Sequence, residues 1–321
     1  MVVFVYAVFI FLILRFSVTL FNFLSNPKLG YYGKHFTDRV SVIVLSPNRQ
    51  TDIKKIVTSI EEQEYRDVEV VVQRNETVTE LMERATGKYF LFITAGMTLH
   101  HGLLNNLIYR VKVFELSVLS LTPTYTAHGF LANCIYPLND FLLLNLFPLR
   151  LIRLSNIPAF AGAGSNDCLF CDATHFKMLG WNESLSKKMP SAAEVVRIAK
   201  QLKFKTEVLL ANKFIRYNVD QIDINSFSSR LLLNFSNSGI AALFYVIFVV
   251  IGPLMILLNY DPALLLLPLG LIFMERLMIA FLTKQNALLQ VFLHPLQMLA
   301  LFILTLRAVG SEFFKSIKLK K

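Results

Sequence analysis

Six residues with polar side chains, or with no side chain, follow three apolar runs that predict buried strands. They come shortly after residues 40–45, 68–72 and 89–93 and are Asn48, Arg49, Arg74, Asn75, Thr94 and Gly96. The carboxyl ends of parallel strands meet at one edge of a sheet, where open α/β folds bind ligands. Guanidinium groups pair well with phosphate, so Arg49 and Arg74 could neutralise a pyrophosphate without a metal ion. Two solvated surface arginines are the alternative interpretation.

Three further pairs of residues have side chains that could do chemistry. They are His100 and His101, Cys168 and Cys171, and Asp167 and Asp172. The histidine pair could bind a metal ion, and a solvated loop is the ordinary alternative. The cysteines form one C-x-x-C without the second pair that a zinc site needs, which favours two small semi-buried residues in a reduced compartment. For the aspartates, a surface-loop or structural role is expected.

Strand and helix patterns alternate around the strand-end residues. The runs VSVIVL (40–45), VEVVV (68–72) and YFLFI (89–93) are continuously apolar, which is typical of strands buried on both faces. This alternation predicts a doubly wound parallel sheet. The predicted helices are residues 52–64, 77–85 and 103–113, and a further strand is predicted at 116–121.

The composition predicts a membrane protein. The chain has 321 residues, of which 55% are hydrophobic, and a mean hydropathy of +0.53. This is too apolar for an ordinary soluble domain. The net charge of +10 would suit nucleic acid or an anionic membrane surface. Because the apolar runs are long, we favour the membrane and expect no nucleic-acid partner.

Residues 2–24 are almost wholly apolar and long enough to span a bilayer. No basic residue precedes them and no cleavage site of small residues follows, so an anchor is expected rather than a removed signal peptide. Arg15 interrupts the run and should face protein or extend to the membrane surface. Lys28, Lys34 and Arg39 follow, which predicts a cytoplasmic α/β domain by the positive-inside rule.

The C-terminal third predicts a second membrane region, with segments of span length at residues 239–258, 263–282 and 289–309. The tail, residues 315–321, holds four lysines and is expected on the cytoplasmic side. Three full spans after a cytoplasmic domain would instead leave the tail outside, so one segment is expected to be re-entrant or interfacial. Residues 131–154 are apolar but broken by prolines, and predict an interfacial segment or a buried helix.

Several segments together resemble family 2 glycosyltransferases of the GT-A fold. VSVIVLSPNR resembles the opening strand of that family, and TSIEEQEYRDVEVVV resembles the next helix and strand, with Gln63 and Glu69 in place. ATGKYFLFITAG resembles the strand that leads to the metal corner. AGAGSNDCLFCDATHFKMLG resembles the acceptor-side strand, and EVVRIAKQL resembles the helix that carries the catalytic base. The apolar ends are similar to those of membrane-anchored members that glycosylate lipids such as carotenoids.

The resemblance also implies where the chemistry should lie, and the chain departs from the family there. Thr94 and Gly96 stand at the positions of the Asp-x-Asp pair that holds a divalent cation, so no metal cofactor is expected. Residues 73–75 replace the aspartate that should end the second strand. Glu194 and Val195 stand where Glu-Asp should supply the base. A shift of one residue would make Glu194 the catalytic candidate, and the six strand-end residues are the nucleotide-binding candidates.

The sequence therefore predicts an α/β protein with a GT-A-type sheet, like that of nucleotide-diphospho-sugar transferases, and transmembrane helices at both ends. The expected function is transfer of a sugar, of the hexosyltransferase class, from a nucleotide sugar to a lipid or polyprenoid-type acceptor. The alternative is a catalytically inactive relative that acts as a binding or assembly subunit, perhaps with a partner glycosyltransferase. The expected parts are residues 1–25 (anchor), 38–236 (glycosyltransferase-like domain), 237–310 (two to three membrane helices) and 311–321 (basic tail).

Overall fold

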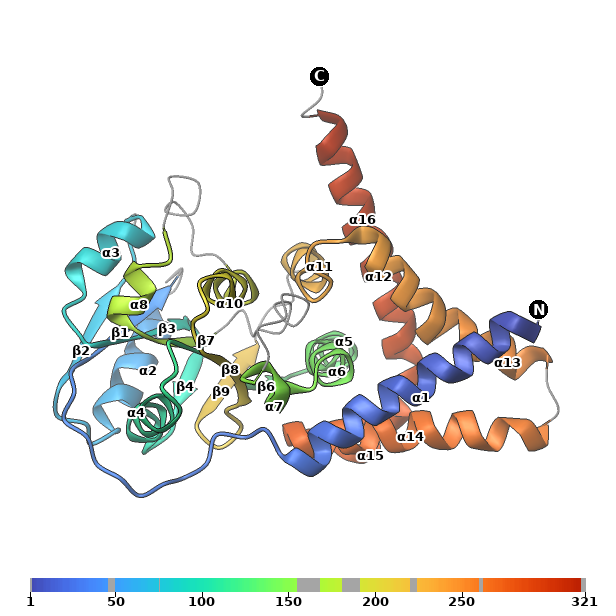
Figure 1. Cartoon of the computed structure of the whole chain (residues 1–321), viewed down its shortest axis with the longest axis horizontal. Helices are drawn as coiled ribbons and strands as arrows, with labels where there is room; N and C mark the ends of the chain where they lie inside the picture. The colour runs from blue at the N-terminus through green and yellow to red at the C-terminus, as the bar shows by residue number, and fades with distance from the viewer. Residues whose placement is uncertain are drawn as a thin grey trace. The chain divides into compact units, whose positions relative to one another are not determined.

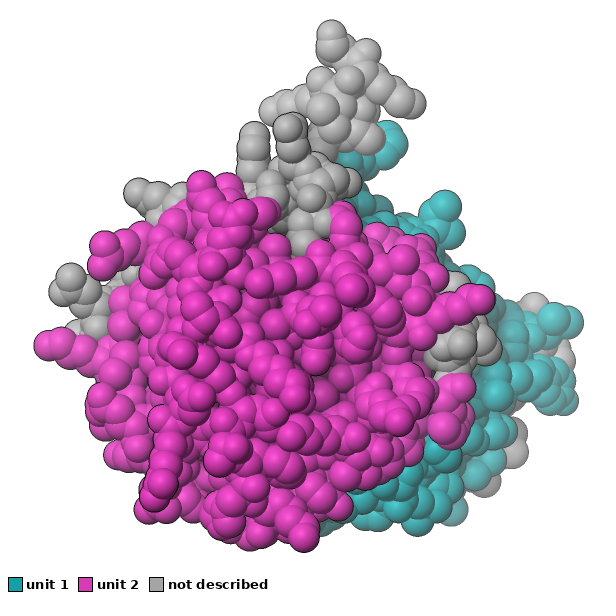
Figure 2. Space-filling view, turned by 60° about the vertical axis from the view of Figure 1, so that its left-hand side comes forward, with its two compact units in different colours: residues 1–26, 127–148, 220–321 teal, residues 27–126, 149–219 magenta. Residues whose placement is uncertain are grey.

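The chain folds into two compact units, which are coloured separately in Figure 2. The α/β unit comprises residues 27–126 and 149–219, and the helical unit comprises residues 1–26, 127–148 and 220–321. The computed structural model describes residues 2–45, 50–74, 76–154, 168–180, 191–219, 224–259 and 262–318.

The central sheet of the α/β unit has six strands in the order β2-β1-β3-β7-β5-β8. The first three are adjacent and parallel, as predicted, with Val44 beside Val72 and Leu45 beside Thr94. Only part of the prediction of a parallel sheet holds, because β7 runs antiparallel between β3 and β5. The strands are β1 (Val40–Leu45), β2 (Val68–Val72), β3 (Tyr89–Thr94), β5 (Val118–Thr122), β7 (Cys168–Asp172) and β8 (Thr206–Leu210).

Helices cover both faces of this sheet (Figure 1). Alternate residues of a strand point to opposite faces, so Leu91 of β3 packs with the α2 and α4 side while Phe90 and Phe92 pack with the α3, α8 and α10 side. This double burial explains the continuous apolar runs of the strands. The helices are α2 (Gln50–Glu61), α3 (Val78–Arg84), α4 (Leu103–Phe114), α8 (Ala173–Lys177) and α10 (Ala192–Gln201).

A small second sheet begins where β3 ends. It has the order β4-β9-β6, and β4 pairs antiparallel with β9, so Met97 lies beside Tyr217. The chain passes from the central sheet to this one through Ala95 and Gly96. The strands are β4 (Met97–Leu99), β6 (Thr124–Ala127) and β9 (Ile215–Val219).

Four helices of the helical unit, among the residues described, are long and apolar enough to cross a membrane. They run over Val3–Ser25, Gly239–Leu258, Leu265–Thr283 and His294–Phe313, close to the four segments that the sequence predicted. The second contains a π-helical turn, Ile247–Ile251, between α12 (Gly239–Val246) and α13 (Gly252–Asn259). The other helices of this unit are α1 (Val2–Ser25), α5 (Phe130–Ile135), α6 (Pro137–Leu146), α11 (Ile224–Leu233), α14 (Pro262–Thr283), α15 (Ala287–Phe292) and α16 (His294–Lys318).

A buried polar network joins three of these helices. Arg15 of α1 lies 3.0 Å from Glu275 of α14, and the exposed fractions of the two side chains are 6% and 1%. Asn145 of α6 bonds to both, and Thr19 donates to Glu275 at 3.3 Å. Of the two positions foreseen for Arg15, the structure has the one that faces protein.

Candidate functional site

The corner where β3 ends is built from backbone and small side chains. Thr94 lies beside Leu45 of β1, and the amide of Ala95 donates to the carbonyl of Leu45 at 3.3 Å. Gly96 has φ of +93°, in the left-handed region, and a Cβ there would lie 3.2 Å from the ring of Tyr217. The tight turn therefore favours glycine for two reasons, its backbone angle and its neighbour.

The end of β2 brings Arg74 to the same edge of the sheet. The amide of Gln73 donates to the carbonyl of Val44 at 3.0 Å, which continues the pairing of β1 and β2. The amide of Arg74 then donates to the carboxylate of Glu76 at 3.1 Å, while the Arg74 side chain is exposed. Because β1, β2 and β3 are parallel neighbours, Arg74, Thr94 and Gly96 lie at their common carboxyl edge. Three other candidates, Asn48, Arg49 and Asn75, lie outside the described residues.

Topology places Glu194 toward the same edge. Helix α10 is joined to β8 by residues 202–205 only, so it runs back along the sheet and its last turn lies near the start of β8. β8 is parallel to β5, which in turn runs parallel to β3, so the first turn of α10 lies toward the carboxyl edge. Glu194 is in that first turn.

The two alternatives for the base occupy different environments. Val195 is fully buried in the core beneath α10, where it cannot meet a ligand. The side chain of Glu194 is 33% exposed and lies 3.8 Å from Arg197, and its amide donates to the hydroxyl of Ser191 at 3.2 Å. Glu194 is therefore the member of the pair that can reach solvent or a ligand.

The other side chains considered from the sequence do not converge on this corner. Asp172 pairs with Tyr89 at the opposite edge of the sheet and caps α8 by accepting from the amides of Thr174 and His175. The structural role expected for Asp172 is the one observed, and Asp167 lies outside the described residues. Cys168 and Cys171 pack into cores on opposite faces of the sheet.

The histidine pair also lies away from the corner. His100 and His101 precede α4, whose first amide, of Leu103, donates to Gln63 at 3.0 Å. Gln63 follows α2 near the start of β2, which is the opposite edge of the sheet. Across the described parts of the chain, no group of three or more His, Cys, Asp and Glu is placed to hold a metal ion.

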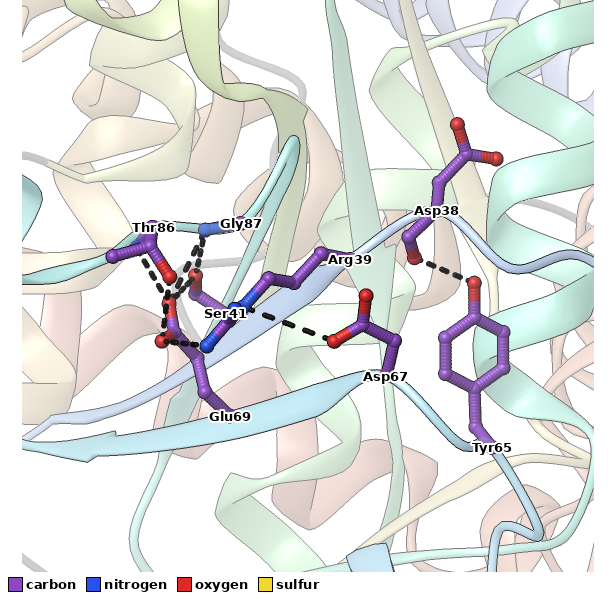
Figure 3. Close-up of polar contacts among 8 residues, drawn as sticks. All are labelled: Asp38, Arg39, Ser41, Tyr65, Asp67, Glu69, Thr86 and Gly87. Carbon is purple, nitrogen blue, oxygen red and sulfur yellow. Dashed lines mark hydrogen bonds and ion pairs between the residues drawn. The ribbon is translucent and has the colours of Figure 1, made fainter.

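A cluster around Glu69 fixes the amino edge of β1, β2 and β3 (Figure 3). Its carboxylate accepts from the Ser41 hydroxyl, from the amide and hydroxyl of Thr86 at 2.5 and 2.8 Å, and from Gly87 at 3.2 Å. Arg39 lies 3.2 Å away. Burial acts to raise the pKa of Glu69, but the hydrogen bonds from Ser41 and Thr86 and the charge of Arg39 outweigh it, so the pKa is lowered.

Two residues of the family resemblance, Glu69 and Gln63, have structural roles. Glu69 joins three strand starts, and Gln63 bridges the carbonyl of Ser59 and the amide of Leu103. Gly87 cannot carry a side chain, because a Cβ would lie 2.5 Å from the Ser41 amide nitrogen. The spacing of Ser41, Glu69 and Gly87 in the sequence does not indicate that they lie together. Only the structure shows that they form one cluster.

The fold is that of a glycosyltransferase. The chain is similar to the mannosyltransferase PcManGT from Pyrobaculum calidifontis, solved in complex with GDP-Man and Mn²⁺. The TM-score is 0.51 at 12% identity, over 91% of this chain and 99% of that chain. It is also similar to residues 1–349 of S. aureus TarS in complex with UDP-GlcNAc, with a TM-score of 0.39 at 10% identity, over 87% of this chain and 92% of that one. No protein-family model matches the sequence, and a search of curated proteins finds no match.

The likeness to PcManGT confirms the predicted GT-A-type fold with apolar helices at both ends. At 12% identity it concerns the fold alone. The described residues at the end of β3 offer the hydroxyl of Thr94 and no carboxylate, which does not fit Mg²⁺ or Mn²⁺ because these ions prefer carboxylate oxygens. Metal independence of this chain stays a prediction.

Proposed function

We propose that this chain is a membrane-embedded glycosyltransferase-like protein of family 2 that transfers a sugar from a nucleotide sugar to a lipid acceptor. The observation that carries the proposal is the likeness to a glycosyltransferase over 91% of the chain, apolar helices included. A donor would bind at the carboxyl edge of β1, β2 and β3, as ligands do in open α/β sheets. The apolar helices would hold the protein where lipid acceptors are found.

In this proposal, Glu194 is the general base. It is an acid in the first turn of α10, partly exposed and toward the correct edge. The exposed guanidinium of Arg74 would offset the charge of the leaving nucleoside diphosphate. Arginine cannot orient a diphosphate as octahedral metal ligands do, so we expect slow turnover that does not respond to EDTA.

The experiment is a transfer assay on purified membranes that contain the chain, with GDP-mannose first because PcManGT binds it. Loss of a general base typically lowers the rate about 10²–10⁴-fold, so Glu194→Gln should abolish most transfer. The matched control is Glu83→Gln, which removes an exposed carboxylate of α3. Transfer that persists in Glu194→Gln would rule out Glu194 as the base, and EDTA-sensitive transfer would contradict the metal-free site.

The alternative function is a binding or assembly subunit without catalysis. The observation that favours it is the end of β3, where Thr94 and Gly96 supply no carboxylate. A titration of the purified chain with a nucleotide sugar, with and without Mn²⁺, separates the two functions. Tight binding without turnover favours the inactive subunit, and binding that requires Mn²⁺ contradicts both metal-free proposals.

A further inference from the structure

A cavity of about 390 Å³ lies among α14, α15 and α16 in the helical unit. Its wall is almost wholly apolar and includes Leu269 and Phe273 of α14 and Val291 of α15. Two polar side chains reach it, Arg276 of α14 and His294 at the start of α16. A volume of this size falls within the range of small-molecule sites, which are mostly apolar with a few placed polar groups.

Arg276 has hydrogen-bonding capacity that the described protein atoms do not use. Its side chain is 1% exposed, and its Nη2 donates to the Gln290 side chain at 2.6 Å. Its Nε and Nη1 are buried without a hydrogen-bond partner among the described residues. A buried donor without a partner destabilises the protein, and more so when it is charged. Such an arrangement is expected where a ligand completes the site.

The neighbouring acids, Asp140 and Glu275, attract Arg276 electrostatically, but the hydrogen bonds described below involve other residues. Glu275 bonds to Arg15, Thr19 and Asn145, and Asp140 accepts from Gln285 at 2.7 Å. No described carboxylate lies within ion-pair distance of Arg276. Arg276 lies in the cavity wall with its guanidinium almost wholly covered, so a small shift of the side chain would bring it to an acidic group in the cavity. Charge-assisted hydrogen bonds of this kind are the strong ones.

The residues that line the cavity are spread along α14, which suits a long, thin ligand. Arg276 lies seven residues before the end of α14, which is about 10 Å along the helix axis. Leu266, also in the wall, lies ten residues further back, about 15 Å from Arg276 along the same helix. The cavity is thus apolar toward the start of α14 and polar just past the middle of the helix.

The exposed residues at the outer rim of the cavity indicate what surrounds its opening. Leu266, Leu269 and Phe273 are 79%, 50% and 48% exposed on α14. This helix is long and apolar enough to cross a membrane, and apolar side chains on the outside of such a helix meet lipid chains. A ligand that enters from this side is itself a lipid.

We propose that this cavity binds one anionic lipid, whose acidic head accepts hydrogen bonds from Arg276 and whose hydrocarbon chain follows α14 toward Leu266. The inference rests on the membrane embedding proposed above and not on sugar transfer. Phosphate and carboxylate heads share the required chemistry, so the test distinguishes them.

The test uses the full-length chain in a neutral detergent and three diazirine-tagged probes: dodecyl phosphate, dodecanoate and dodecanol. Photolabelling followed by peptide mapping should place the two acidic probes on the segments around Leu269 and Val291. Dodecanol should label them at least about tenfold more weakly at equal concentration, because it lacks the charge that Arg276 recognises. The stronger of the two acids identifies the head. Excess inorganic phosphate should not compete, because it lacks the chain.

Two variants examine the head and the chain separately. Arg276→Gln should weaken labelling by the acidic probes about tenfold or more, while Arg307→Gln, at an exposed position of α16, should not. Gly270→Phe should block the chain without touching Arg276, because a Cβ at Gly270 meets open space. Gly310→Phe is its control, since a Cβ at Gly310 also meets no atom within 4 Å.

Equal labelling by dodecanol, or labelling that neither Arg276→Gln nor Gly270→Phe weakens, would overturn the proposal. Competition by inorganic phosphate would show an ion site instead of a lipid site. Extraction of the chain from membranes by alkaline carbonate would overturn the membrane embedding on which the inference rests. None of these measurements involves a nucleotide sugar, so the absence of transfer activity would leave the result unaffected.

Discussion

Gly96 is constrained at the residue scale by its backbone angle and by its neighbour. Its φ of +93° is one that residues other than glycine rarely adopt, and an added Cβ would lie 3.2 Å from the ring of Tyr217, which is a tight contact. An aspartate at this position would therefore have to strain the turn and displace the ring. The difference between this corner and an Asp-x-Asp corner thus involves the path of the backbone as well as the identity of two side chains.

We expect Gly96→Ala to lower the free energy of unfolding by about 1–2 kcal/mol from its backbone angle alone, with a further loss from the contact with Tyr217. Thermal unfolding of the full chain in detergent is the measurement. The control is Gly129→Ala, which has the same φ of +93° but no atom within 4 Å of the added Cβ. Equal losses at the two positions would show that the Tyr217 contact costs nothing.

The carboxylate of Glu69 should make the fold sensitive to acid. Its pKa is lowered in the folded chain from an ordinary value of 4.5, so the unfolded chain binds the proton more tightly. The stability it contributes is therefore present above pH about 4.5 and is lost as the pH falls through the folded pKa. We expect Glu69→Gln to lower the melting temperature at pH 7 and to flatten its fall below pH 5.

Melting curves of the wild type and Glu69→Gln between pH 3 and pH 7 check this expectation. Glu62→Gln, which removes an exposed carboxylate after α2, is the control and should follow the wild type. Parallel curves for Glu69→Gln and the wild type would show that Glu69 is not a source of the acid sensitivity.

At the scale of elements, apolar runs predicted the strands well and their directions less well. VSVIVL, VEVVV and YFLFI became β1, β2 and β3 because a strand covered by helices on both faces must be apolar at every position. Strand β7, CLFCD, is also mostly apolar but runs antiparallel to β3, and hydrophobicity does not encode the direction of a strand. Residues 131–154, left open as interfacial or buried, lie in three short helices, α5, α6 and α7 (Leu149–Ile152), and the short segments that join them, with many buried residues.

The candidate site could be predicted only in part. Because β2 and β3 are parallel, their carboxyl ends lie at the same edge of the sheet. Arg74 and Thr94 were therefore foreseen at that edge. The environment of Glu194 and Val195 was not, because a helix start can shift by one residue without changing the apolar pattern. The cluster around Glu69 was also not foreseen, since its members come from three separate segments of the sequence.

The pair of Arg15 and Glu275 should be a main stabiliser of the contact between α1 and α14. Removing one member of a buried ion pair costs about 3–5 kcal/mol, because the remaining charge stays buried without its partner. We expect Arg15→Leu to lower the unfolding free energy in detergent by that amount. The double variant Arg15→Leu/Glu275→Leu should recover most of the loss, because replacing both members of such a pair is often neutral. A double variant as unstable as the single one would contradict this account.

On the scale of the whole molecule, the basic residues predict on which side of the membrane the α/β unit and the tail lie. The basic residues after α1 predict a cytoplasmic α/β unit, and the lysines of the tail predict a cytoplasmic C-terminus. Both can hold only if one of the three apolar helices that follow the α/β unit does not cross completely. The pairing of Glu275 with Arg15 allows α14 to cross, because its acid is neutralised inside the helical unit.

Cysteine labelling of intact cells tests these sides. The three native cysteines are buried, so background labelling should be low. We expect Glu83→Cys in the α/β unit and Lys315→Cys in the tail to react with an impermeant reagent only after the membrane is opened. Labelling of Lys315→Cys from outside, with Glu83→Cys protected, would contradict the cytoplasmic tail and favour full crossing by all three helices that follow the α/β unit. Labelling of Glu83→Cys from outside would show that the α/β unit is not cytoplasmic.

The ion pair between α1 and α14 has a consequence for the order of synthesis. Its members are 260 positions apart, so at about 5–20 residues per second the ribosome needs roughly 13–52 s to make the second after the first. If the first helix inserts into the membrane as proposed, it carries during that interval a cation whose carboxylate has not yet been synthesised. A ribosome that stops between the two leaves a first helix with a lone charge, which is poorly held by lipid and exposed to degradation. Arg15 of the first helix therefore has its ion-pair partner only in a chain that has been synthesised as far as Glu275.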